Sequence, residues 1–162
     1  MARYERSVRV RAPLADVWEF HSTADGLVAL TPDWMGLEIE DVRGPDGERD
    51  PAVLGTGSVI RSSVRPFDVG PRQTWLSEIV AREHEGGSAY FRDVMSDGPF
   101  EEWTHTHLFY ADGGETIVRD CVEYELPFGA LGRAAGPFAV VGFEPMFRYR
   151  HRRTKALLEA DQ

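Results

Sequence analysis

The sequence has one cysteine, one lysine and no long uninterrupted apolar run. Cys121 cannot form an intramolecular disulfide, and one cysteine cannot build a cysteine-based zinc site. This cysteine usage is compatible with a reducing cytosol. No run approaches the roughly 18 apolar residues of a membrane span, and the charged start MARYERSVRV lacks the apolar core of a signal peptide. We therefore expect a soluble, cytoplasmic protein without integral membrane association.

Basic residues are also in deficit: 18 Lys and Arg stand against 27 Asp and Glu, for a net charge of −9. Such a charge repels phosphates and argues against nucleic-acid binding. The one strongly basic run, RYRHRR at 148–153, is interpreted as the solvent face of a last helix, where it suits the helix dipole. A transient contact with an anionic membrane surface is the alternative. No phosphate-binding glycine motif, P-loop or GxSxG occurs, so we expect no cofactor.

The length of 162 residues fits one domain, 1–162, which is large enough to build a hydrophobic core without disulfides or a structural metal ion. Residues 3–11 alternate as a half-buried strand does. Pro13 suits the first turn of a helix, and a second short helix at about 24–30 stops before Pro32. Another strand is expected at 37–42. The chain thus opens with a strand and two short helices.

A meander follows, in which turn-forming residues separate strand-like runs at about 58–65, 73–84, 88–95, 101–110 and 115–126. Consecutive strands with short turns pair antiparallel. A final helix is expected from about Phe138 or Glu144 to the end. This order predicts an α+β fold, with a curved antiparallel sheet of about six to seven strands wrapped round a long C-terminal helix. A cavity between sheet and helix remains where the inward side chains do not fill it.

Strand alternation places four polar residues on the more aromatic faces, which we take as inward: Asp93, His105, His107 and Asp120. Burying an unpaired carboxylate costs several kcal/mol, so inward acids need partners. We expect hydrogen bonds between these aspartates and histidines across neighbouring strands.

Four interpretations of this group are open. The residues could form structural pairs that fix strand register, or the polar floor of a ligand pocket. They are also the catalytic candidates: Asp93 or Asp120 would raise the basicity of His105 or His107, which would act as a general base. The His-x-His spacing with nearby carboxylates could bind a metal. That spacing alone is a weak signal, and no metal is predicted.

The predicted pocket is apolar with a few polar groups, as small-molecule sites usually are. Trp34, in the segment TPDWMG, is expected either at its mouth or as a cap on the core. The residues predicted to bind the ligand are Trp34, Trp75, Phe91, Asp93, Met95, Trp103, His105, His107, Phe109, Asp120 and Tyr124.

The element order and the stretch FRDVMSDGPFEEWTHTHLFYADGGETIVRDCVEYELPFGALG resemble the START-like, helix-grip superfamily, in particular its polyketide cyclase/dehydrase-like (SRPBCC) branch. The opening APLADVWEFHS is also similar to the start of that family. The matching residues are Phe91, Asp93, Met95, Gly98, Pro99, Phe100, Trp103, His105, His107, Phe109, Asp120, Tyr124, Leu126, Pro127 and Gly129. The resemblance implies a helix-grip fold around a pocket. Its members bind lipids, sterols and hormones or catalyse cyclisation and dehydration, so no catalytic set carries over.

Three functions follow from these observations. The first is binding of a small hydrophobic molecule with a polar end, such as a lipid, an isoprenoid or a polyketide-like compound. The second is a cyclase or dehydratase-type enzyme that uses an Asp–His acid–base pair in the same pocket. The third is an interaction or chaperone module with an incidental cavity. The oligomeric state is not set by the sequence.

Overall fold

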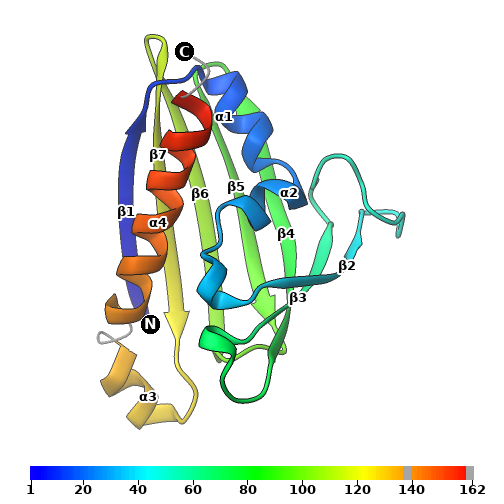
Figure 1. Cartoon of the computed structure of the whole chain (residues 1–162), viewed down its shortest axis with the longest axis vertical. Coiled ribbons are helices and arrows are strands. Elements are labelled where there is room, and N and C mark those ends of the chain that lie inside the picture. The colour runs from blue at the N-terminus through cyan, green and yellow to red at the C-terminus, as the bar shows by residue number, and fades with distance from the viewer. Residues whose placement is uncertain (137–139, 160–162) are drawn as a thin grey trace.

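The computed structural model describes residues 1–136 and 140–159. Its centre is a seven-stranded antiparallel sheet in the order β1-β7-β6-β5-β4-β3-β2, curved around the last helix (Figure 1). The strands are β1 Ala2–Val10, β2 Glu38–Arg43, β3 Val59–Val64, β4 Gln73–Glu85, β5 Ser88–Ser96, β6 Glu102–Asp112 and β7 Glu115–Glu125. The predicted α+β helix-grip fold is confirmed, and the strand boundaries lie within about two residues of those predicted.

Tight glycine turns fix the register of the long strands. The β4–β5 turn uses Gly86 at φ 58°, and the β6–β7 turn uses Gly113 at φ 63°. Residues with a side chain rarely adopt this left-handed conformation, so glycine suits both turns. The second turn aligns β6 with β7 so that His107 lies opposite Asp120. The turn therefore positions the polar residues of the two strands on one face.

The helices are α1 Leu14–His21, α2 Ala24–Ala29, α3 Gly129–Ala135 and α4 Val140–Glu159, with 3-10 turns η1 Asp33–Met35 and η2 Pro66–Asp68. Helices α1, α2 and α4 cover the concave face of the sheet, and α3 lies beyond the end of β7 (Figure 1). The two short helices predicted after β1 are present. Of the two predicted starts of the last helix, Glu144 lies inside α4 and Phe138 lies outside the described residues. Within 1–136 and 140–159, no helix combines the length and apolar content needed to cross a membrane.

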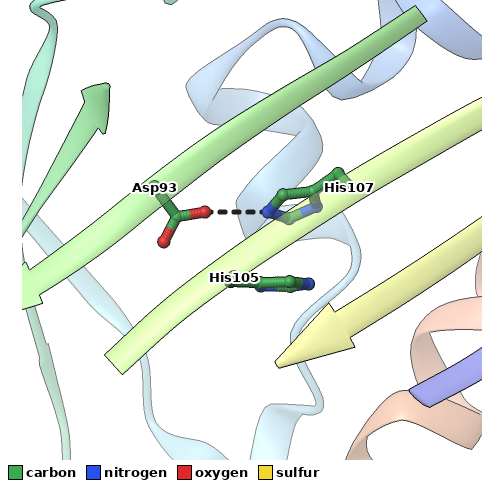
Figure 2. A group of neighbouring side chains, drawn as sticks. All are labelled: Asp93, His105 and His107. Carbon is green, nitrogen blue, oxygen red and sulfur yellow. Dashed lines mark hydrogen bonds and ion pairs between the residues drawn. The ribbon is translucent and has the colours of Figure 1, made fainter. Parts of the chain in front are cut away.

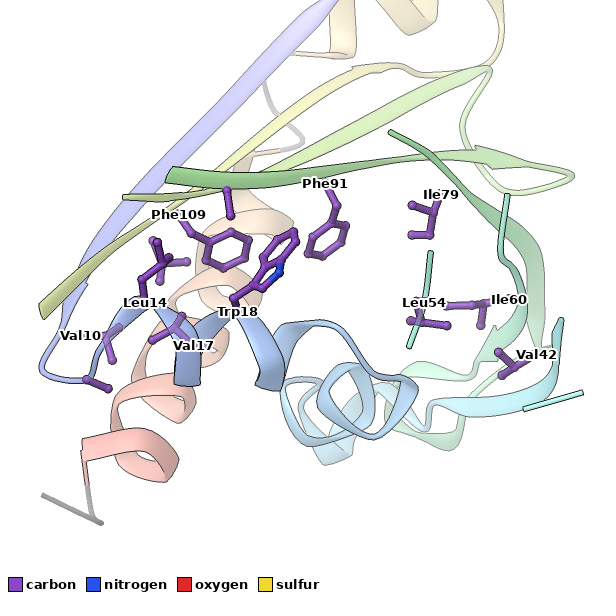
Figure 3. Close-up of a cluster of buried hydrophobic side chains, with 13 residues drawn as sticks. Val10, Leu14, Val17, Trp18, Val42, Leu54, Ile60, Ile79, Phe91 and Phe109 are labelled. Carbon is purple, nitrogen blue, oxygen red and sulfur yellow. The ribbon is translucent and has the colours of Figure 1, made fainter. Parts of the chain in front are cut away.

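Two hydrophobic clusters form the core. In the first, Trp18 of α1 lies between Phe91 and Phe109 of the sheet, with ring centroids 6.1 and 5.5 Å away (Figure 3). In the second, aromatic residues of β1, β7 and α4 pack together; Tyr4 and Phe147 are its centre, with ring centroids 5.2 Å apart. The polar residues of β5, β6 and β7 belong to neither cluster. They form a site of their own.

Candidate functional site

A cavity of about 170 Å³ lies against the concave face of the sheet. Strands β3 to β6, helix α2 and helix α4 all contribute to its wall, which is mostly apolar; Leu30, Ile60, Trp75, Phe91 and Phe147 are among its lining residues. A dry cavity of about 150 Å³ with such a lining accepts benzene. The cavity therefore has room for a small aromatic or aliphatic group.

Asp93, His105 and His107 give the cavity a polar wall. His107 donates from Nε2 to Asp93 Oδ2 at 2.8 Å (Figure 2), although the residue directly opposite Asp93 is His105. His107 also lies between two rings: the Phe91 centroid is 3.9 Å from its own, and the His105 centroid is 3.6 Å away. The hydrogen bond and the stack together hold both imidazoles in fixed orientations.

Behind this wall, Asp120 joins three elements. It is 3% exposed. His105 of β6 donates from Nε2 to its Oδ1 at 2.7 Å, and His151 of α4 donates from Nε2 to its Oδ2 at 2.6 Å. Although burial disfavours the charged form, these two hydrogen bonds hold the pKa of Asp120 well below its usual range. Asp120 is therefore a buried carboxylate that ties the sheet to α4.

Asp93 and His107, which line the cavity, also have shifted pKa values. Burial, together with the neighbouring His105, lowers the pKa of His107 to about 4. Burial acts to raise the pKa of Asp93, but the hydrogen bond from His107 and the electrostatic influence of His107, His105 and Arg150 together outweigh it, so the pKa of this carboxyl lies below its usual value. Near neutral pH the pair is thus a carboxylate and a neutral imidazole. Because Nε2 carries the proton, Nδ1 of His107 is an acceptor, and it is buried without a hydrogen-bond partner in the described part of the chain.

A metal ion shared by Asp93, His105 and His107 does not fit this arrangement, although one ligand atom from each lies within 4.8 Å of the others. An imidazole binds a metal in the plane of its ring. The two rings are stacked with their planes only 28° apart, so an ion between them would lie well outside at least one plane. The geometry suits hydrogen bonding instead.

The structure brings together seven of the eleven residues predicted to bind a ligand: Trp75, Phe91, Asp93, Met95, Trp103, His105 and His107 line the cavity. The other four lie elsewhere. Phe109 and Tyr124 are buried in the two core clusters, and Asp120 lies behind His105. Trp34 is 39% exposed and stacks on Phe67 at a centroid distance of 5.0 Å, away from the cavity.

The sequence does not predict three titratable residues of the site: His21, Arg150 and His151. The interpretation of 148–153 as a solvent face is wrong for Arg150 and His151, which are 9% and 3% exposed. The signal was the helical period, because the buried stripe begun by Phe143 and Phe147 continues at these positions. The basic residues of 148–153 make this part of the buried stripe resemble an exposed helix face.

Comparisons with known proteins agree with this architecture. The family model described as polyketide cyclase / dehydrase and lipid transport matches residues 1–159. No curated protein sequence matches the chain significantly.

Solved structures share the fold over almost the whole chain. Protein CV1439 of Chromobacterium violaceum is 13% identical with a TM-score of 0.67, and the match covers 98% of this chain and 99% of that one. Norcoclaurine synthase of Thalictrum flavum, solved with dopamine and hydroxybenzaldehyde, is 16% identical with a TM-score of 0.65, covering 98% and 87%. The protein TTHA0849 of Thermus thermophilus is 19% identical with a TM-score of 0.58, covering 96% and 99%. At these identities the likeness shows the fold alone.

Proposed function

We propose, since this chain belongs to the polyketide cyclase / dehydrase and lipid transport family, that it binds a small, largely hydrophobic molecule with a polar end in its internal cavity. The observation that carries the proposal is the cavity itself, which is lined mostly by apolar side chains; its polar residues include Asp93, Arg150 and three histidines (His21, His105 and His107). Apolar burial supplies affinity, and the polar groups orient the ligand.

The size of the cavity narrows the ligand class. At about 170 Å³ it is smaller than the roughly 300–1,000 Å³ of drug-sized pockets. A ligand of one or two rings, or a short isoprenoid or acyl chain, is the best match. The norcoclaurine synthase that shares the fold was solved with dopamine and hydroxybenzaldehyde, which are also small aromatic compounds.

Blocking the cavity should abolish binding without unfolding the chain. Ser62 of β3 is buried and lines the cavity. We expect Ser62→Phe to place its ring in the empty volume and to weaken the binding of 2-naphthamide, an uncharged probe, by at least about tenfold. Titration followed by naphthalene fluorescence measures this change, and thermal unfolding reports whether the variant is folded.

The neighbouring Arg61 offers a matched control, since it is exposed on the outer face of the same strand. Arg61→Phe adds the same ring outside the cavity and should leave the affinity unchanged. Equal affinities of wild type and Ser62→Phe would mean that the probe binds elsewhere, and the cavity would lose its proposed role.

A second candidate function, acid–base catalysis, is favoured by the geometry of His105. Asp120 holds its Nε2, while the ring lines the cavity and Nδ1 makes no hydrogen bond with the part of the chain that the structure describes. A carboxylate that orients one imidazole nitrogen leaves the other for proton transfer. His107 is less well placed, because its Nδ1, the nitrogen that Asp93 does not bind, is fully buried.

A general base at His105 should exchange the α-protons of a bound ketone. We expect the wild type to accelerate deuterium incorporation into the methyl group of 2-acetonaphthone in D₂O, measured by proton NMR, and His105→Gln to lose about 10²-fold or more of that acceleration. His84→Gln changes an exposed histidine of β4 and should retain it. No acceleration by the wild type would leave ligand binding alone as the proposed function.

A further inference from the structure

Arg150 is a buried arginine whose guanidinium has no partner in the described part of the chain. The residue is 9% exposed and lines the cavity from α4. Its Nε is fully buried without a hydrogen bond, and its guanidinium forms no ion pair with any described carboxylate. The ring centroid of Phe147 lies 5.9 Å from Cζ. The other arginines of the basic run, at 148, 152 and 153, are exposed.

This arrangement is costly for the folded chain. A guanidinium keeps its charge in proteins, and a buried charge costs several kcal/mol unless it is paired. The buried carboxylates do not pair with it. Asp120 receives hydrogen bonds at both oxygens from His105 and His151, and Asp93 receives one from His107. The guanidinium of Arg150, a residue that lines the cavity, therefore has N–H donors without a hydrogen-bond acceptor in the described part of the chain.

We propose that Arg150 binds the carboxylate of the ligand, and that the cavity accepts small aromatic or short-chain carboxylic acids. This inference rests on the proposed function, which it makes more specific. A guanidinium matches a carboxylate through two parallel N–H···O hydrogen bonds, which are stronger than those to a neutral oxygen. The hydrocarbon part of the acid would lie against the apolar wall, with Phe91 and Trp75 among its contacts.

The carboxylate of Asp93 limits the effect. Asp93 lines the same cavity and is ionised near neutral pH, so it repels an incoming anion. Because repulsion offsets part of the attraction, the expected preference for an acid over its neutral analogue is about tenfold rather than a thousandfold.

The experiment compares two probes of nearly the same shape, 2-naphthoate and 2-naphthamide, at neutral pH. We expect the wild type to bind naphthoate about tenfold more tightly, and Arg150→Met to bind both with similar affinity. Arg152→Met removes an exposed charge from the same helix and should keep the tenfold preference. In wild-type protein, the Nε–H resonance of Arg150 should shift on addition of naphthoate and not of naphthamide. This measurement holds even if Arg150→Met does not fold.

The outcomes separate the two proposals. If naphthamide binds the wild type as tightly as naphthoate, the assignment of an acid is overturned and the binding function stands. A naphthoate preference that survives in Arg150→Met, or an Nε–H resonance that does not respond, overturns the role of Arg150. If neither probe binds the wild type, the proposed function fails, and the inference fails with it.

Discussion

Replacing Asp120 with alanine is expected to lower the free energy of unfolding by about 3–5 kcal/mol, because it breaks a buried charged network by removing its centre. Both oxygens of Asp120 accept hydrogen bonds, one from His105 and one from His151. The alanine variant leaves two buried imidazoles without acceptors, and each unsatisfied polar group adds about 1–3 kcal/mol. It also releases the contact between β7 and α4. Urea unfolding at neutral pH measures the loss.

The adjacent residue provides the control. Arg119 lies on the outer face of β7, where its side chain is 41% exposed and donates to Glu5 at 2.7 Å. Exposed ion pairs contribute about 0–1 kcal/mol, so Arg119→Ala should change stability by less than about 1 kcal/mol. A similarly small loss in Asp120→Ala would show that water or a rearranged α4 satisfies the two histidines.

The sheet could be predicted from the sequence because its signals are local. Alternating residues fix which face of a strand is buried, and glycine pairs such as Gly113-Gly114 mark the ends. Once the face of β6 was known, the inward position of His105 and His107 followed, as did their pairing with aspartates on neighbouring strands. Strand alternation determines which face of the sheet a residue lies on, and the positions of these histidines and aspartates depend only on that face.

The features that the sequence does not predict depend on where helices cover the sheet. Phe109 shares a face with His105, but α1 lies over it, so it belongs to the core rather than the cavity. The sequence does not predict helix α3, because the glycines at 129, 132 and 136 are more typical of a loop than of a helix. The sequence predicts that Arg150 and His151 are exposed, because charged residues on a helix are usually solvated. Only the packing of α4 against the sheet shows that they are buried.

Acidification from pH 7 to pH 5 is expected to lower the free energy of unfolding by about 4 kcal/mol, chiefly through two buried histidines. Burial lowers the pKa of His21 to about 3 and that of His107 to about 4. In the unfolded chain both titrate near 6.5. Below that pH the unfolded chain binds protons that the folded chain does not, so stability falls as pH falls. Each histidine contributes roughly 2 kcal/mol over this interval, and the loss continues until pH reaches the folded-state pKa.

The contribution of His21 can be isolated, because its role in the fold is simple. Its Nδ1 donates to the carbonyl of Val17 one turn earlier at 2.8 Å, and a glutamine side chain can also donate. In His21→Gln the loss between pH 7 and pH 5 should fall by about half, to roughly 2 kcal/mol. His84→Gln removes an exposed histidine and should show the full loss. Urea unfolding of the three proteins at both pH values measures the difference. If His21→Gln lost as much stability as the wild type, His21 would have to gain its proton within the folded chain, and α1 would have to open to solvent at pH 5.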